Sequence, residues 1–167
     1  MEKKFPVRKK IRLEGYDYSQ AGYYFVTICV EDGHEMLGRV VGDAVLCVPN
    51  VELSEIGEIV KTFLEKMNTV VEHAVLEKYV IMPNHIHLLI ELKDGTQRTA
   101  SPTKAMIPRI VHGMKCVVTK QIGYSVWHRS YHDRIIRIRS ADEYQRIWQY
   151  IENNPAKWAE DRYFVNK

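Results

Sequence analysis

Two histidines separated by one residue, His85 and His87, lie within a strongly apolar stretch at residues 79–92. Side chains two positions apart on a β-strand project from the same face of the sheet, so a strand here would place the two imidazoles side by side. Such a pair is costly to remove from water, but it is well placed to hold one divalent metal ion. The alternative is a hydrogen-bonded histidine pair at a sheet surface.

A second pair of polar side chains, Tyr150 and Asn154, lies near the end of a predicted helix. They are four residues apart and therefore share one helical face. A tyrosine hydroxyl can attack a phosphodiester, but with a reference pKa of about 10 it needs a metal ion or a charged group beside it. The amide oxygen of Asn154 could join two imidazoles in a metal shell, which suits Mg²⁺ or Mn²⁺ acting as a Lewis acid. Simple packing and a helix stop before Pro155 are the alternative.

Hydrophobic spacing predicts the elements that must hold these side chains. Strands are expected at residues 23–30, 70–81, 85–92 and 131–138, with a hairpin at 38–48 whose tip is at 42–43. Helices are expected at residues 51–68, 104–122 and 141–154. Pro108 falls inside the second, so a start of that helix at Pro108, with the proline in its first turn, is the alternative, and the third follows a capping box at 140–143. The connection at 83–84 is too short for a parallel crossover. The order therefore predicts an α+β fold, an antiparallel sheet with helices mainly on one face.

The size and composition of the chain are typical of a globular protein. Its 167 residues, 46% hydrophobic and 27% charged, predict one domain over residues 1–167, with a basic arm at 1–20 and a polar, mobile loop at 93–103. No apolar run reaches the roughly 18 residues of a membrane span, and the N-terminus has no signal-peptide core, so we expect a cytoplasmic protein. The cysteines are widely spaced in apolar surroundings, which predicts buried thiols rather than disulfides or a zinc cluster; they are Cys29, Cys47 and Cys116.

Positive charge gathers in two segments, although the net charge is only +3. One is the N-terminal arm, and the other is the segment at 127–139, which also carries aromatic rings. Cations beside aromatic side chains are typical of surfaces that bind single-stranded DNA through phosphate contacts and base stacking. A solvated tail and an aromatic anchor at a sheet edge are the alternative. The candidates for DNA contact are Lys9, Lys10, Arg12, Trp127, Arg129, Tyr131, Arg134 and Arg137.

Four segments of the chain resemble one protein family. Residues 79–89, which contain Met-Pro-Asn-His-Ile-His, resemble the HUH motif (histidine, hydrophobic residue, histidine) of single-tyrosine transposases, and most closely that of the REP-associated tyrosine transposases in the IS200-like superfamily. Residues 22–27 resemble the first strand of that family and residues 126–137 its tryptophan-rich basic strand. Residues 150–155, Tyr-Ile-Glu-Asn-Asn-Pro, resemble its tyrosine helix. The resemblance covers most of the chain.

The resemblance implies a role for each candidate. His85 and His87 would be metal ligands, and Tyr150 would form a 5′-phosphotyrosine link to single-stranded DNA. Asn154 would be a third ligand, although several relatives have glutamine there. The implied fold is the ferredoxin-like sheet of HUH nucleases. The implied activity is cutting and rejoining of single-stranded DNA at hairpin or repeat sequences, with Mg²⁺ or Mn²⁺ and no nucleotide cofactor. Relatives build the site within a monomer or across a homodimer.

Two other functions fit the same residues. One is a protein that binds DNA hairpins without cutting them, and the other is a metal-dependent phosphoesterase that uses activated water while Tyr150 only packs. The presence of both histidines, Tyr150 and Asn154 argues against loss of the chemistry.

Overall fold

A computed structural model describes residues 20–42, 49–93, 106–136 and 141–165. Except for residue 20, the predicted arm lies outside the described residues, and so do its Lys9, Lys10 and Arg12. The predicted loop lies outside them except for residue 93, and Arg137 also lies outside them. The elements are β1 (Gly22–Cys29), β2 (Gly38–Val41), β3 (Asn50–Leu53), α1 (Glu55–Val70), β4 (Ala74–Ile81), β5 (His85–Leu92), α2 (Met106–Ile122), β6 (His132–Ile136) and α3 (Ala141–Asn153), with 3₁₀ turns η1 (Glu31–Gly33) and η3 (Pro155–Glu160).

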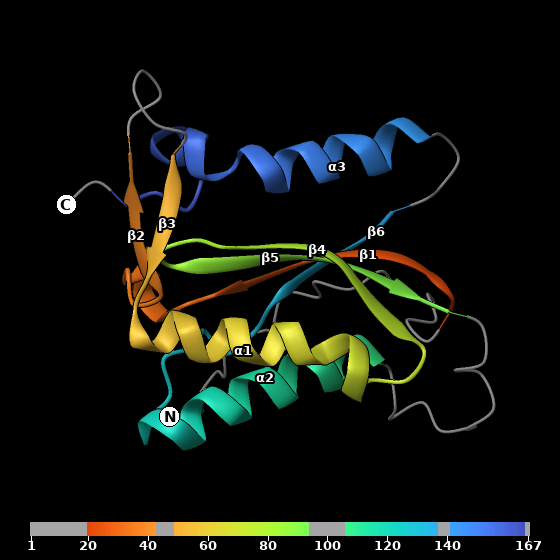
Figure 1. Ribbon diagram of the computed structural model, residues 1–167, viewed down its shortest axis with the longest axis horizontal. Coiled ribbons are helices and arrows are strands. Elements are labelled where there is room, and N and C mark those ends of the chain that lie inside the picture. The colour runs from red at the N-terminus through yellow and green to blue at the C-terminus, as the bar shows by residue number, and fades with distance from the viewer. Residues whose placement is uncertain (1–19, 43–48, 94–105, 137–140, 166–167) are drawn as a thin grey trace, which may run out of the picture.

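Strands β4, β5, β1 and β6 form one antiparallel sheet in that spatial order. In chain order β1, α1, β4, β5, α2 and β6 make a βαββαβ unit, the ferredoxin-like arrangement. Helices α1 and α2 cover one face of this sheet side by side, and α3 lies on the opposite face (Figure 1). The predicted α+β fold, with an antiparallel sheet and helices mainly on one face, is confirmed.

The predicted start of the first helix is wrong. Residues 51–53 belong to β3, which pairs with β2 in a small separate sheet. They alternate apolar and polar side chains, which is the period of a strand. The helix begins only after Ser54, whose hydroxyl accepts a hydrogen bond from the Gly57 N–H at 3.1 Å and so caps α1. The helix also runs to Val70, so β4 starts four residues later than predicted.

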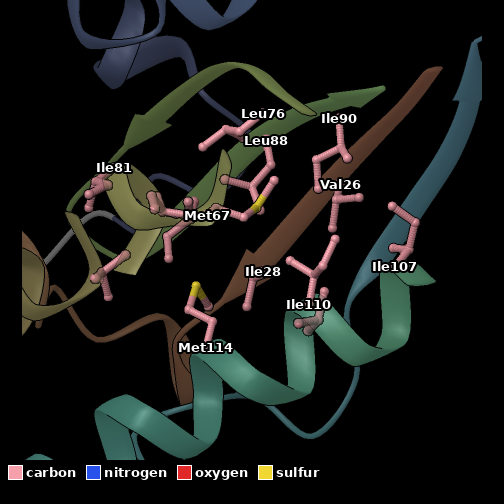
Figure 2. Packing of buried hydrophobic residues seen from close by; sticks show 14 of the residues in the cluster. Val26, Ile28, Met67, Leu76, Ile81, Leu88, Ile90, Ile107, Ile110 and Met114 are labelled. Carbon is pink, nitrogen blue, oxygen red and sulfur yellow. The ribbon is translucent and has the colours of Figure 1, made fainter. Parts of the chain in front are cut away.

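Strand β5 is the most deeply buried strand of the sheet, with seven of its eight residues buried. Ile86, Leu88 and Ile90 face the core formed with α1 and α2. Figure 2 shows Leu88 and Ile90 in this core. The alternate residues His85, His87 and Leu89 face α3, where Leu89 packs with apolar residues of that helix. A strand covered on both faces has a continuous apolar sequence, which explains the run that surrounds the two histidines.

Of the helices in the described part of the chain, none has both the length and the apolar character needed to cross a bilayer. Cys29 and Cys116 are free thiols, but Cys116 is exposed on α2, so the prediction of burial is wrong for that residue. Apolar residues near Cys116 in the sequence point into the core, but Cys116 itself lies on the exposed face of the helix.

Two backbone hydrogen bonds of Leu37 fix the turn that precedes His85. The Leu37 N–H donates to the Pro83 carbonyl at 2.9 Å, and the Leu37 carbonyl accepts from the Ser54 N–H at 3.0 Å. Gly57 of α1 lies so close that a Cβ there would overlap the Leu37 carbonyl oxygen. The first turn of α1 and the turn at 83–84 are therefore held against the same short segment.

This contact predicts opposite effects for two glycine substitutions in helices. Gly57→Ala should lower the free energy of unfolding by about 1–3 kcal/mol, because the backbone of Leu37 must shift. Gly113→Ala in α2 should raise it by about 0.5–1 kcal/mol, because the nearest atom, on Phe63, would lie at an ordinary 3.8 Å. Urea unfolding followed by circular dichroism measures both. Equal changes in the free energy of unfolding for the two substitutions would contradict the close contact between Gly57 and the Leu37 carbonyl.

Candidate functional site

His85 and His87 converge on one point inside the protein. Both side chains are 0% exposed, and their Nε2 atoms lie 3.0 Å apart. They project from the same face of β5, and α3 and the segment that follows it cover them. The pair is therefore buried, which argues against the alternative of a pair at a sheet surface.

Each imidazole is oriented through its Nδ1 atom. Asn84 donates from Nδ2 to the carbonyl oxygens of Gly33 and Tyr163, at 3.1 and 2.7 Å, which fixes the orientation of its amide. Its Oδ1 therefore accepts from His85 Nδ1–H at 2.9 Å and leaves His85 Nε2 as an acceptor. On β1, the buried Thr27 Oγ1 lies 2.8 Å from His87 Nδ1. Metal-binding histidines are commonly held by such partners.

Burial also sets the charge of the pair. It lowers the pKa of His85 to about 4, against a smaller opposing effect of the Asp161 carboxylate. It lowers the pKa of His87 well below its usual range, and the neighbouring His85 and the Arg162 guanidinium act in the same direction. Both rings are therefore neutral near pH 7, as metal coordination requires.

Tyr150 of α3, and Asn154 directly after the end of that helix, lie at the histidine pair within the same chain. The Tyr150 hydroxyl lies 3.3 Å from His87 Nε2, and its side chain is 40% exposed. Phe25 of β1 stacks on His87 and meets Tyr150 edge-on. Asn154 is 2% exposed, and its Oδ1 is buried without a hydrogen-bond partner among the described residues. The four predicted site residues thus lie together.

Asp161 joins this group, although nothing in the sequence analysis indicated it. Its Oδ2 accepts from the Tyr150 hydroxyl at 3.1 Å and from Asn154 Nδ2 at 3.0 Å. Ligand atoms of His85, His87 and Asp161 all lie within 4.8 Å of one another. Two neutral imidazoles, a carboxylate and the unpartnered amide oxygen of Asn154 are a donor set for a divalent cation. The residues present therefore fit a divalent metal ion.

The environment of Tyr150 keeps its phenol protonated. Burial and the nearby Asp161 carboxylate raise the pKa of Tyr150 to about 12, and the hydrogen bond to that carboxylate acts in the same direction. The phenolic proton thus lies on the Asp161 side. For this hydroxyl to act as a nucleophile, its proton must leave as the new bond forms.

The residues predicted to contact DNA fall into different settings. Trp127 is 5% exposed and packs in the core, so a role in base stacking does not fit its position; packing, the alternative, describes it. Tyr131 also packs against that core. Arg129 is exposed. Arg134 is exposed as well, and it pairs with Glu143 of α3 at 2.7 Å. DNA contact by the two arginines stays a prediction.

Comparison with known proteins agrees with this architecture. The chain is 30% identical over 177 residues to an uncharacterized protein of Haemophilus influenzae, covering 95% of this chain and 94% of that protein, and it belongs to the same protein family. No family model matches it. A solved structure of a REP-associated tyrosine transposase bound to a REP hairpin aligns with a TM-score of 0.57, at 16% identity, over 84% of this chain and 70% of that one.

That similarity confirms the transposase resemblance at the level of the fold: the chain has the fold of a tyrosine transposase. A structure from Deinococcus radiodurans R1 also aligns, at 21% identity over 87% of this chain and 98% of that one, with a TM-score of 0.46.

The contact between Thr27 and His87 predicts a measurable effect on metal binding. Thr27→Val keeps the shape of the side chain but removes the hydroxyl that orients His87, so Mn²⁺ affinity should fall roughly tenfold. Thr27→Ser should restore it. Thr62→Val, which removes an exposed hydroxyl on α1, is the control. Titration calorimetry with Mn²⁺ gives the affinities, and an unchanged affinity in Thr27→Val would contradict the role of this hydroxyl.

The lowered histidine pKa values predict a pH-dependent stability. An unfolded histidine has a pKa of about 6.5, whereas that of His85 in the folded protein is about 4, so the unfolded chain binds more protons between these values. The free energy of unfolding in EDTA should therefore decrease as the pH falls from about 6.5 to about 4. The decrease should be smaller in His85→Leu/His87→Leu than in the exposed-site control His112→Leu. Equal pH dependence in the two variants would refute the assignment.

Proposed function

We propose that this protein is a metal-dependent enzyme that nicks and rejoins single-stranded DNA through a phosphotyrosine intermediate on Tyr150. The observation that carries the proposal is the position of the Tyr150 hydroxyl, 3.3 Å from His87 Nε2 and 3.1 Å from Asp161 Oδ2. A weak nucleophile is activated by an adjacent base or by a metal ion, and the Asp161 carboxylate and the neutral histidine pair can supply these two functions beside Tyr150. The transposase fold supports the same conclusion.

The metal ligands we propose are His85, His87 and Asp161, with the amide oxygen of Asn154 as a fourth protein donor. Three of these four were predicted from the sequence. When bound, Mg²⁺ or Mn²⁺ would supply Lewis-acid stabilisation of the charge that develops on a phosphate. The remaining chemistry falls to side chains of the chain itself.

Tyr150 and Asp161 would handle the proton of the first step. The Tyr150 oxygen forms a bond to phosphorus, the bond between phosphorus and the 3′-oxygen breaks, and the strand leaves with a 3′-hydroxyl. Asp161 Oδ2, which accepts the hydrogen bond of the Tyr150 hydroxyl, takes the phenolic proton as Tyr150 attacks. The departing 3′-oxygen takes one proton from water, and Asp161 then releases its proton to water, so the step is balanced. The 5′-phosphotyrosine keeps the bond energy, which allows a second 3′-hydroxyl to reverse the step and join strands.

The partner that we propose is single-stranded DNA next to a hairpin. The solved transposase with this fold is bound to a REP hairpin, and the exposed Arg129 of the present chain is available for phosphate contact. Hairpin binding without cleavage and hydrolysis by water are the competing functions. Neither needs the Tyr150 hydroxyl to face the histidine pair.

The test of the proposed function is a covalent adduct. Wild-type protein incubated with Mn²⁺ and a single strand that carries a hairpin should yield a protein–DNA adduct that survives denaturing electrophoresis. Tyr150→Phe should reduce the adduct below detection, because it removes the nucleophile. EDTA should do the same.

The matched control is Tyr144→Phe. Tyr144 lies on the same helix, but its hydroxyl faces Glu77 at 3.4 Å rather than the histidine pair. This variant should keep its adduct. An adduct that persists in Tyr150→Phe would exclude Tyr150 as the nucleophile, and cleavage without any adduct would favour hydrolysis by water.

A further inference from the structure

A cavity of about 630 Å³ opens beside Tyr150, between β6, α3 and the segment after η3. A second cavity, of about 330 Å³, is lined by Tyr150, Asn154 and Asp161. Tyr150 is thus shared by two spaces. A strand whose phosphate is attacked by Tyr150 must continue on both sides of that phosphate, so each space can receive a neighbouring part of the strand.

The larger cavity has one apolar wall. Phe25 and Ile147 line it, and Phe25 rests on His87 with ring centroids 5.0 Å apart. Because the Phe25 ring contacts both His87 and Tyr150, its position is fixed by the same residues that build the site. A planar, rigid apolar surface of this kind suits a nucleobase.

The same cavity is also lined by a positively charged side chain, that of Arg162. The guanidinium carbon of Arg162 lies 4.5 Å from the centroid of the Tyr163 ring, which orients the side chain. None of the ion pairs between described residues includes Arg162, whereas Arg134, on the same cavity, pairs with Glu143. One guanidinium nitrogen of Arg162 donates to the Tyr163 hydroxyl. A guanidinium held in this way has further N–H groups that suit a phosphate oxygen.

We propose that this cavity binds the nucleotide next to the phosphate attacked by Tyr150, with its base against Phe25 and Ile147 and a phosphate at Arg162. The proposal rests on the proposed function for the position of the attacked phosphate. Arg162 is then a positioning residue, which holds the strand in register with Tyr150. The volume lies within the range of about 300–1,000 Å³ that is usual for sites that enclose small ligands.

The first experiment measures binding without cleavage. A fluorescein-labelled oligothymidine of about ten nucleotides is titrated with protein at several salt concentrations, and anisotropy gives the affinity. Arg162→Gln should weaken binding roughly tenfold, and the slope of log affinity against log salt should become shallower by about 0.7, the value for one phosphate contact on a single strand. Arg162→Lys should restore part of both.

The control is Arg39→Gln. Arg39 is exposed on β2 and already pairs with Glu52, so its loss should change neither the affinity nor the slope. Equal affinity of Arg162→Gln and wild type overturns the proposal, and so does a failure of the wild type to bind the probe.

The second experiment tests the apolar wall with the base as the variable. A set of probes is made in which each oligothymidine has a single abasic nucleotide at a different position. Wild type should bind at least one of these probes roughly tenfold more weakly than it binds intact oligothymidine. Phe25→Leu should reduce that preference while keeping the dependence on Arg162. A preference that Phe25→Leu leaves unchanged shows that the base lies elsewhere and overturns the proposal.

The cavity and the proposed function can fail separately. Binding that depends on Arg162 and Phe25 in a protein that forms no Tyr150 adduct supports the nucleotide site and refutes the enzyme. Adduct formation on a hairpin-bearing strand at the wild-type rate in Arg162→Gln, with unchanged affinity, refutes the cavity and leaves the enzyme intact.

Discussion

The 3.0 Å approach of His85 and His87 Nε2 in a fully buried setting is the constraint on which the site depends. Two imidazoles taken out of water at this distance must be neutral and must have their remaining nitrogens satisfied. Asn84 does this for one ring and Thr27 for the other, and each partner comes from a different element. The loss of either partner would leave a buried polar atom unpaired and a ring free to turn.

The antiparallel sheet provides this arrangement through its register. Thr27 of β1 is the direct cross-strand neighbour of His87, and Cys29 is that of His85. The hydrogen bond between Thr27 and His87 can therefore form only because β1 lies beside β5. Because α1 and α2 cover one face, the opposite face is left for α3 and the segment after it (Figure 1). Helix α3 supplies Tyr150, and Asn154 follows directly after its last residue; both lie more than sixty residues from the histidines along the chain.

The spacing of apolar residues predicted those features of the fold that depend on local sequence. The strand that carries the histidines and the helix that carries Tyr150 both follow regular apolar spacing, so their faces could be assigned before the structure was known. Val51 and Leu53 were misassigned because apolar residues two apart fit a strand as well as part of a helix. Asp161 and Arg162 could not be found from the sequence, since they lie in an irregular segment beyond Pro155, and only the chain path brings them to the site.

The central claim is that one chain carries both halves of the reactive site, and complementation between two inactive variants tests it most directly. Tyr150→Phe keeps the histidines and His85→Ala/His87→Ala keeps the tyrosine, so each variant retains one half. Wild type should form the covalent adduct with a hairpin-bearing strand, whereas an equimolar mixture of the two variants should form none, because a site built within one chain cannot be repaired by another. Adduct formation by the mixture would contradict the account and show that Tyr150 of one chain acts at the histidines of a second copy.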